Sequence, residues 1–313
     1  MFSEFLTELE SKEIHVSFSE GKIKYSGPEQ YINAQLIDNL KHYKGKLIKY
    51  LWPTECSNMM PINTEGSKVP FILLHGEKMN YPLSNHFGID QPFYGFFHYG
   101  SEGEKIFHKK VEAFAKDYIS QLQKIQPKGP YYLGGFSFGG LVAFEMAVQL
   151  QKQGFEVPVL ILIDCKIPMF KEPVHASNVF LKISLEFYNY SKYIYYWLFH
   201  KARRLYYEFF LLFKTRLHKK NRNYYIMGTY SQIAMRYKPK SHYNGEILLF
   251  RSQQNNSAHE YLGWDNLCDH VNMVIVEGNH KTIYESEESY NVLSKNIGEW
   301  IEKANGYNKK NAS

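Results

Sequence analysis

The chain has 313 residues, of which 44% are hydrophobic and 22% are charged. This length suits one large domain with a smaller one, and the hydrophobic content excludes a chain that is disordered throughout. The formal charge of +6 is mildly basic, but there is no Arg-rich arm or zinc-finger spacing, so nucleic acid is not an expected partner. Three cysteines, Cys56, Cys165 and Cys268, are too few for a disulfide framework and favour a cytoplasmic location.

The first 53 residues predict a small separate α+β unit. Phe5 and Leu9 have helical spacing, and two segments of alternating polarity on either side of Glu20-Gly21 are typical of a β-hairpin. A helical period then runs from residue 36 to residue 51, with Gly45 as the point where it divides into two helices. Residues 54–68 have no clear period, and we interpret them as a linker.

Strands and helices alternate along the second unit, residues 69–305. This alternation predicts an α/β domain with a mostly parallel sheet, whose chemistry lies at the carboxyl ends of its strands. The expected strands are 69–76, 92–97, the segment that begins at 131, 157–164, 246–252 and the segment that begins at 271. The expected helices are 106–125, 141–154 and 289–304.

One segment, residues 166–237, interrupts the alternation with a long, basic, aromatic and mainly helical sequence. We interpret it as a lid over the carboxyl edge of the sheet. Its aromatic residues suit either of two roles: packing on the core, or a roof over a lipophilic acyl chain. Contact with a membrane surface is the rival use of such a helix. The apolar stretch 193–213 contains four charged residues, so it is a poor membrane span, and membrane contact is not expected.

The pentapeptide Gly135-Phe136-Ser137-Phe138-Gly139 matches the G-x-S-x-G pattern of a nucleophile elbow. It lies between a predicted strand and a predicted helix, which is the context that the motif requires. A tight turn there projects the serine hydroxyl, and the glycines leave room for close backbone contacts. Ser137 is therefore the candidate nucleophile, and the alternative is a plain glycine-rich turn.

A serine hydroxyl needs a neighbouring base, and in this arrangement the acid and then the histidine follow the serine along the chain. His280 is the best placed histidine, because it follows the last predicted strand in a Gly-Asn-His loop. His259 and His270 are weaker candidates, since neither directly follows a strand.

The acid of the triad has two possible positions. Asp164 ends the strand 157–164, and it would hold the imidazole in the correct tautomer. Glu260 and Asp265 lie in the loop after the strand 246–252, but farther from its end. We therefore favour Asp164.

An oxyanion hole needs two backbone N–H groups. Phe138, directly after the nucleophile, is expected to supply one, and Glu77, in the loop after the first strand of the large domain, the other. His75 precedes the nucleophile, so we expect it to shape this loop rather than to act as the base. The sequence has no H-E-x-x-H, C-x-x-C or EF-hand pattern, and no metal or bound cofactor is expected.

The segment GPYYLGGFSFGGLVAFEMAVQLQKQGFEVPVLILID resembles the core of type I thioesterase domains from nonribosomal peptide and polyketide synthetases. The similarity continues through AMRYKPKSHYNGEILLFRSQ, LGWDNL and EGNHKTIYE, and it covers most of residues 69–303 outside the lid. It implies an α/β-hydrolase with Ser137 as nucleophile, His280 as base and Asp164 as acid. The first loop, HGEKMN, contains less glycine than this family usually has, which leaves the second oxyanion donor open.

This resemblance implies an enzyme that releases or edits an acyl or peptidyl chain carried on the phosphopantetheine of a separate carrier protein. Residues 1–53 resemble the docking domain of tubulysin-synthetase type, which captures the C-terminal tail of an upstream synthetase. Lys22 and Lys24 in the hairpin would then meet an acidic tail. Two alternatives stay open: a general carboxylesterase or lipase, and a docking adaptor without catalytic activity.

Overall fold

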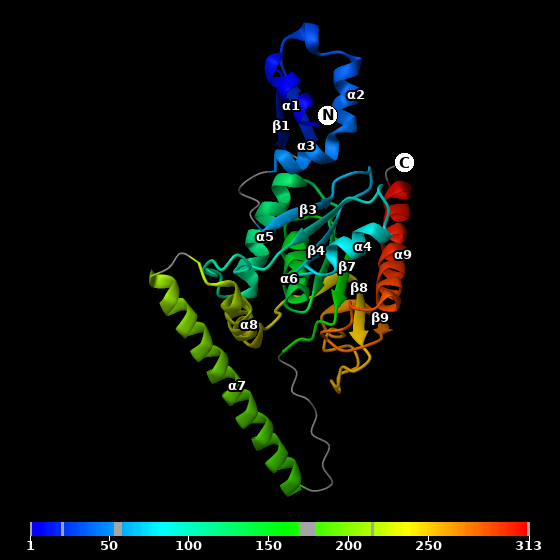
Figure 1. The fold of residues 1–313 in the computed structure, drawn as a ribbon. Coiled ribbons are helices and arrows are strands. Elements are labelled where there is room, and N and C mark those ends of the chain that lie inside the picture. The colour runs from blue at the N-terminus through cyan, green and yellow to red at the C-terminus, as the bar shows by residue number, and fades with distance from the viewer. Residues whose placement is uncertain (1, 20–21, 53–57, 169–178, 214–215, 312–313) are drawn as a thin grey trace.

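The computed structural model describes residues 2–19, 22–52, 58–168, 179–213 and 216–311. Figure 1 shows a small N-terminal unit that lies on one end of a larger α/β unit, and one long helix that extends away from the larger unit. Among the described residues, no helix combines the length and the apolar character needed to cross a membrane.

The N-terminal unit has the predicted order of helix, hairpin, helix and helix. Its elements are α1 (Phe2–Ser11), β1 (His15–Ser19), β2 (Lys22–Ser26), a 3-10 turn (Glu29–Tyr31), α2 (Ala34–His42) and α3 (Lys44–Tyr50). Asn33 begins α2, because its side chain accepts a hydrogen bond from the Leu36 N–H at 3.0 Å. A small apolar core that includes Phe5 and Leu9 of α1 and Leu40 of α2 holds the unit together.

The large unit is built on a sheet of seven strands in the order β3-β5-β4-β6-β7-β8-β9. The strands are β3 (Met59–Asn63), β4 (Phe71–Leu74), β5 (Phe93–Phe96), β6 (Tyr132–Phe136), β7 (Val159–Ile163), β8 (Tyr243–Ser252) and β9 (Cys268–Val276). All neighbouring strands pair in parallel except β3, which runs antiparallel to β5 at the edge. The prediction of a mostly parallel sheet is therefore confirmed.

The linker expected at residues 54–68 is too long, because β3 lies within it and belongs to the sheet. Strand β3 is short, contains Pro61 and pairs with one neighbouring strand only. Its sequence therefore lacks the alternating or continuous apolar pattern that predicts a strand. Residues 53–57 lie outside the described residues. Helix α4 (Asn80–His86) was also not predicted, since its seven residues are too few for a helical period.

Helices cover both faces of the sheet. On β7, Leu160 and Leu162 face the cluster that contains α5 (Val111–Ile125) and α6 (Phe138–Lys152). Ile161 and Ile163 face the opposite cluster, to which α4 and α9 (Glu287–Asn311) contribute. Because the central strands are buried on both faces, they are continuous apolar runs, as the sequence predicted.

The expected lid consists of two helices with different positions. Helix α8 (Lys219–Arg236) lies over the carboxyl edge of the sheet, while α7 (Val179–Phe213) packs beside α8 and extends beyond the body of the protein. Most described aromatic side chains of α7 are exposed, so neither expected role, core packing or a roof over the substrate, fits them. Residues 169–178 and 214–215 of the predicted lid lie outside the described residues.

Candidate active site

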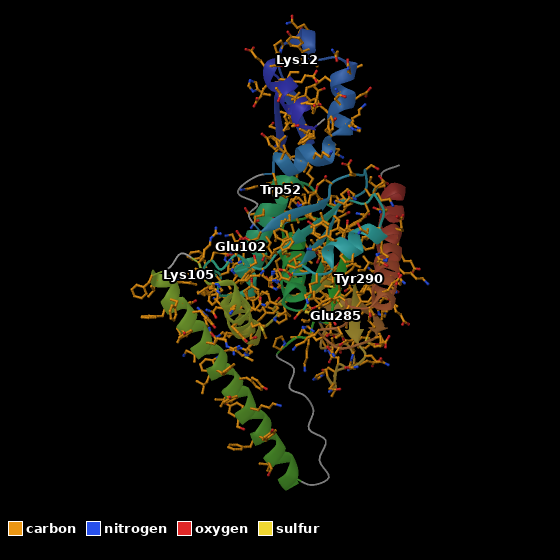
Figure 2. The ribbon with its side chains drawn as sticks, viewed as in Figure 1. Lys12, Trp52, Glu102, Lys105, Glu285 and Tyr290 are labelled. Atoms are coloured by element: carbon orange, nitrogen blue, oxygen red, sulfur yellow. The ribbon has the colours of Figure 1, made fainter. Side chains whose placement is uncertain are left out.

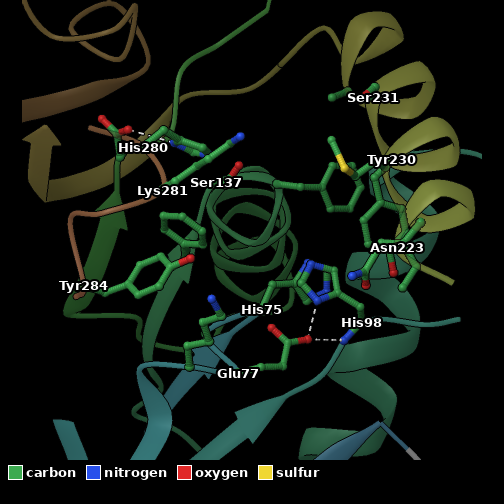
Figure 3. A pocket seen from close by; sticks show the side chains of 18 of the residues that line it. His75, Glu77, His98, Ser137, Asn223, Tyr230, Ser231, His280, Lys281 and Tyr284 are labelled. Atoms are coloured by element: carbon green, nitrogen blue, oxygen red, sulfur yellow. Dashed lines mark hydrogen bonds and ion pairs between the residues drawn. The ribbon is translucent and has the colours of Figure 1, made fainter. Parts of the chain in front are cut away.

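The carboxyl ends of four parallel strands meet at one cavity of about 1480 Å³. The loop after β4 brings Glu77 to it, the end of β6 brings Ser137, the end of β7 brings Asp164, and the loop after β9 brings His280. Figure 3 shows the Ser137 and His280 side chains facing this cavity. Residues that are far apart in the sequence thus lie together, as the topology of a parallel sheet requires.

Ser137 lies at a sharp turn between β6 and α6, with φ of 53° and ψ of −119°. The left-handed φ is strained for a residue with a side chain, and it directs the hydroxyl away from the backbone. The turn needs glycine on both sides. A Cβ on Gly135 would lie 2.3 Å from the carbonyl of Gly139, and a Cβ on Gly139 would lie 2.3 Å from the carbonyl oxygen of Leu74.

His280 is paired with Asp164. Its Nδ1 atom lies 2.8 Å from Asp164 Oδ2, while its half-exposed ring also lies against the ring of Phe136, 4.9 Å between centroids. A carboxylate on Nδ1 holds the imidazole so that Nε2 faces the cavity. The Ser137 hydroxyl forms no hydrogen bond with a described residue, so the serine and the histidine share the cavity without a direct bond.

The Asp164 side chain is fully buried and accepts three hydrogen bonds. Besides His280, the backbone N–H of Ser252 donates to it at 3.0 Å and the amide of Asn255 at 3.1 Å. Burial would raise the pKa of Asp164, but these hydrogen bonds outweigh burial and hold the pKa below its ordinary value. The carboxylate is therefore ionised at neutral pH.

The alternative acids and bases lie elsewhere. Glu260 and Asp265 are exposed in the loop after β8, and the carboxylate against His280 is that of Asp164. Neither His259 nor His270 occurs among the described residues that line the cavity.

The two residues expected to supply the oxyanion donors, Phe138 and Glu77, both line the cavity. Phe138 is the first residue of α6, so its N–H has no acceptor within the helix. No backbone carbonyl of the described residues accepts from the Glu77 N–H, whose acceptor is the carboxylate of Glu77 itself.

The Glu77 side chain accepts hydrogen bonds from His98, both from its backbone N–H at 2.8 Å and from Nδ1. Burial opposes ionisation of Glu77, but the bonds from His98 outweigh it, and the pKa of Glu77 lies below its usual value. These bonds tie the loop after β4 to the loop after β5 and so fix the Glu77 backbone.

His75 is buried beneath the cavity in an aromatic stack. Its ring lies 5.7 Å from that of Phe138 and 5.5 Å from that of Tyr230, and its Nε2 atom hydrogen bonds with the Tyr118 hydroxyl at 2.9 Å. Burial, together with the nearby His98, lowers the pKa of His75 well below its ordinary value. His75 is therefore neutral, and its contacts are those of a residue that shapes the loop.

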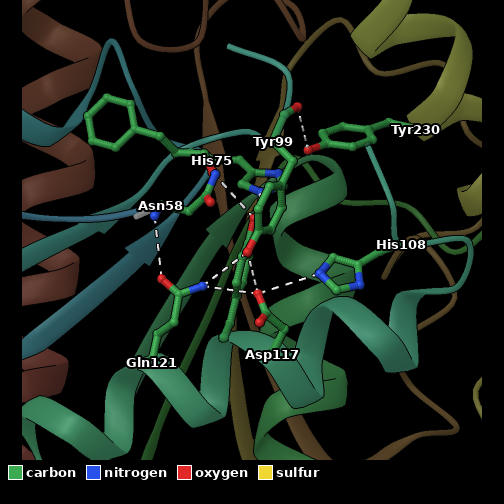
Figure 4. Close-up of polar contacts among 9 residues, drawn as sticks. Asn58, His75, Tyr99, His108, Asp117, Gln121 and Tyr230 are labelled. Carbon is green, nitrogen blue, oxygen red and sulfur yellow. Dashed lines mark hydrogen bonds and ion pairs between the residues drawn. The ribbon is translucent and has the colours of Figure 1, made fainter. Parts of the chain in front are cut away.

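A polar network connects α8 to the body of the protein (Figure 4). The Tyr230 hydroxyl of α8 donates to the Tyr99 carbonyl at 3.1 Å, and the Tyr99 hydroxyl donates to Asp117 of α5. Gln121 donates to both Tyr99 and Asp117, at 3.1 and 3.0 Å, and its carbonyl oxygen accepts from the Asn58 N–H. This network holds α8 in place as one wall of the cavity.

Cationic side chains line the cavity and were not predicted as site residues. They are Lys78, Lys166, Lys219, Arg222 and Lys281. The three carboxylates in the lining each have a basic partner: Glu77 has His98, Asp164 has His280, and Glu102 has Arg222 at 3.3 Å. The cavity thus favours anionic groups. No cluster of three or more His, Cys, Asp or Glu side chains suited to a metal ion occurs among the described residues.

The residues of α8 that line the cavity could not be assigned from the sequence, because a helical period does not say what a helix covers. They include Asn223, Ile226, Met227 and Tyr230. The basic and aromatic composition of residues 166–237 was the only signal, and it did not separate α8 from α7.

A mostly parallel sheet with a serine at a strand-to-helix elbow, and an Asp–His pair at the same edge, defines the α/β-hydrolase class. Two family models match parts of the chain. Residues 77–180 match the thioesterase domain, and residues 3–52 match the TubC N-terminal docking domain.

Relatives support this assignment over part of the chain. The chain is 40% identical over 110 residues to a dimodular nonribosomal peptide synthase of Bacillus subtilis, a match that covers 34% of this chain and 5% of that protein. It is 40% identical over 114 residues to malpibaldin synthetase of Mortierella alpina, covering 35% of this chain and 2% of that protein. The chain therefore spans only a small part of these synthetases.

Solved structures agree on the fold. The thioesterase domain of NocB, in covalent complex with a fluorophosphonate nocardicin G analogue, matches with a TM-score of 0.54 and 19% identity over 79% of this chain and 99% of that one. The surfactin thioesterase domain SrfTE matches with a TM-score of 0.51 and 18% identity over 80% of this chain and 97% of that one.

Proposed function

We propose that this protein cleaves an acyl or peptidyl thioester carried on the phosphopantetheine of a partner carrier protein, through an acyl-enzyme on Ser137. The observation that carries the proposal is the pairing of His280 with the buried carboxylate of Asp164 in the same cavity as the elbow serine. The match of residues 77–180 to the thioesterase domain supports the choice of a thioester as the substrate.

In the first half of the reaction, Ser137 Oγ attacks the thioester carbonyl carbon while His280 Nε2 takes the hydroxyl proton. The N–H groups of Phe138 and Glu77 are the donors to the oxyanion that forms. The carbon–sulfur bond then breaks, and the imidazolium returns its proton to the leaving thiolate. The free thiol stays on the phosphopantetheine, and the acyl group stays on the serine as an ester.

In the second half, water or a nucleophile of the acyl chain itself attacks the ester carbonyl, again with His280 as the base. The serine recovers its proton from His280, and the product leaves. The charged Asp164 favours the imidazolium in both halves. The cationic lining suits this substrate, because phosphopantetheine carries a phosphate that Lys and Arg side chains attract.

The N-terminal unit supports a proposal about delivery of the substrate. Residues 3–52 match a docking domain, and we propose that they bind the C-terminal tail of an upstream synthetase. The hairpin β1–β2 has edges that can accept an added strand, and Lys22 and Lys24 lie on β2, where they favour an acidic tail.

The test is acylation of Ser137. Incubation with an acyl carrier thioester should add the mass of the acyl group to the wild-type protein in intact-mass spectrometry. Ser137→Ala should show no adduct and should lose about 10³-fold or more of the thioester turnover. Ser241→Ala, which changes a serine that does not line the cavity, is the matched control. It should keep both the acyl adduct and the wild-type thioester turnover.

Labelling with a fluorophosphonate separates this proposal from a docking adaptor without activity, since an inactive serine would not react. Comparing the carrier thioester with a simple oxygen ester of the same acyl group separates it from a general esterase. Turnover that persists in Ser137→Ala would refute the mechanism.

A further inference from the structure

Helix α7 carries an exposed apolar stripe with an internal repeat of eleven residues. The side chains in this stripe are exposed by 39% to 73%, although they are aliphatic or phenylalanine. Six of them form two series in which successive members are eleven residues apart, and one further residue follows. The stripe consists of Ile183, Ile194 and Leu205, then Phe187, Leu198 and Phe209, and finally Leu212.

The repeat keeps the stripe on one side of a straight helix. Eleven residues make three turns at 3.67 residues per turn, which is close to the 3.6 of a normal α-helix. The apolar side chains therefore stay in line from residue 183 to residue 212, over about 44 Å at 1.5 Å per residue. A stripe this long and straight fits an extended surface.

A different side of α7, next to and opposite the stripe, packs on the protein. Tyr207 is 9% exposed and lies against Tyr225 of α8, and the carbonyl of Trp197 accepts a hydrogen bond from Gln232 of α8. Glu208 pairs with Arg204 and with Lys109 of the loop before α5. These residues of α7 therefore have partners within the protein, while the side chains of the stripe are exposed.

The exposed apolar sector is too wide for a single partner helix. Tyr188, Phe199 and Phe210 form a further series at eleven-residue spacing, and Tyr195 and Tyr206 lie beside it, all exposed. At 100° per residue, the stripe and these rings together cover about half of the circumference. A helical partner covers a narrow seam, whereas a bilayer interface buries a whole side.

The chemistry of the sector matches the interface of a bilayer. Aliphatic and Phe side chains form the stripe, and tyrosines, which have an apolar ring and a polar hydroxyl, lie beside it. Lys201 is the charged residue on the line of the stripe, and its ammonium leans sideways over the Trp197 ring, 4.8 Å from the centroid. Such a side chain reaches the headgroups while its stem stays in apolar surroundings.

Charge selects the kind of lipid. Residues 179–222, which span α7 and the start of α8, contain ten Lys or Arg and two Glu. Arg216, Lys219 and Lys220 are exposed at the end of the stripe that lies next to the protein body. This excess of cations disfavours pairing with a second copy of the same helix and favours an anionic surface.

Contrary to the expectation from the sequence that the protein makes no membrane contact, we propose that α7 binds flat on an anionic lipid bilayer, with its apolar stripe in the interfacial region, and so attaches the protein to the membrane surface without crossing it. This inference is independent of the proposed thioesterase activity, because no described residue of α7 lines the cavity.

The test is flotation of the full-length protein with vesicles. Vesicles of phosphatidylcholine with phosphatidylglycerol should carry the wild-type protein to the top of a gradient, and pure phosphatidylcholine vesicles should carry less. The double variant Phe187→Asp with Leu198→Asp should bind about tenfold or more weakly, because it places two charges in the buried face.

The matched control is Ile89→Asp with Phe107→Asp, which changes two equally exposed apolar residues of the α/β unit, 75% and 72% exposed. This control should float like the wild type. Circular dichroism should show that both double variants keep their helical content. Equal flotation of both double variants, or no flotation of the wild type, would overturn the proposal. The proposal would also fail if the wild type formed a dimer, did not bind vesicles, and lost the dimer in the α7 double variant. A second copy of the chain would then cover the stripe.

Discussion

Asp164 combines complete burial with a negative charge, and the combination depends on its three hydrogen bonds. Two of the donors, the Ser252 N–H and the Asn255 amide, come from the end of β8 and the loop that follows it. The third is His280 itself. The end of β8 and the loop after it, which were considered as the alternative source of the acid, therefore supply two donors that stabilise Asp164 at the end of the neighbouring strand β7.

Replacing Asp164 with Asn should lower kcat/KM for the thioester by about 10²- to 10⁴-fold, because the amide no longer stabilises the imidazolium. Asp265→Asn is the control, since Asp265 was, with Glu260, an alternative candidate for the acid and is exposed. It should retain wild-type activity. If both variants lost activity equally, the assignment of the acid would be wrong.

The same variant should change how stability depends on pH. The pKa of Asp164 is lower in the folded protein than the ordinary value of about 3.9 in an unfolded chain. The unfolded state therefore binds more protons in acid, and the stabilisation by Asp164 is complete above about pH 5 and is lost as the pH falls through the folded pKa. Between about pH 3 and pH 5, the free energy of unfolding should consequently fall less steeply for Asp164→Asn than for the wild type in urea titrations.

At the scale of elements, the elbow between β6 and α6 depends on the close approach of backbones. Gly135→Ala should lower the free energy of unfolding by about 1–3 kcal/mol, because the new Cβ meets the carbonyl of Gly139, which is backbone and cannot turn aside. Gly298→Ala is the matched change on α9, where no neighbouring atom lies within 4 Å. It should raise the free energy of unfolding by about 0.5–1 kcal/mol through helix propensity. Urea denaturation measures both, and a Gly135→Ala variant as stable as the wild type would contradict this account.

The elements that the sequence predicts well are those whose local pattern and tertiary environment agree. The central strands are apolar on both faces, and the elbow combines a motif with the required strand and helix. The missed elements lack such agreement: β3 contains a proline at a sheet edge, and α4 is only seven residues long.

For α7, the periodicity indicates an amphipathic helix but not which side meets the protein. Packing against α8 decides that, through contacts such as those of Tyr207, whose neighbours in space come from another helix. The cationic lining of the cavity has the same origin, because Lys78, Lys166 and Lys219 come from three separate segments. No local pattern carries information of this kind.

At the scale of the whole molecule, the N-terminal unit packs directly on the α/β unit. Trp52 lies between the two in Figure 2, with its ring stacked against Phe18 of β1 at 5.8 Å and against Tyr94 of β5 at 5.7 Å. Its Nε1–H donates to the Met59 carbonyl of β3 at 2.9 Å. Ile48 of α3 is 2% exposed and belongs to the same apolar cluster as the α5 and α6 side of the sheet. A tail bound to the hairpin would thus be held in a fixed position relative to the α/β unit.

The Trp52→Ala variant tests this coupling. Loss of two ring contacts and one hydrogen bond from a half-buried site should cost about 1–3 kcal/mol, and the cost falls on the interface rather than on either core. In calorimetry the wild type should unfold in one transition, whereas Trp52→Ala should show a separate transition of the N-terminal unit at lower temperature. Trp52→Phe keeps a stacked ring and should keep one transition. Trp300→Ala, on α9 in the apolar cluster of the opposite face of the sheet, should lower the melting temperature without separating the units. Two transitions in the wild type would mean that Trp52 joins the units too weakly to couple them.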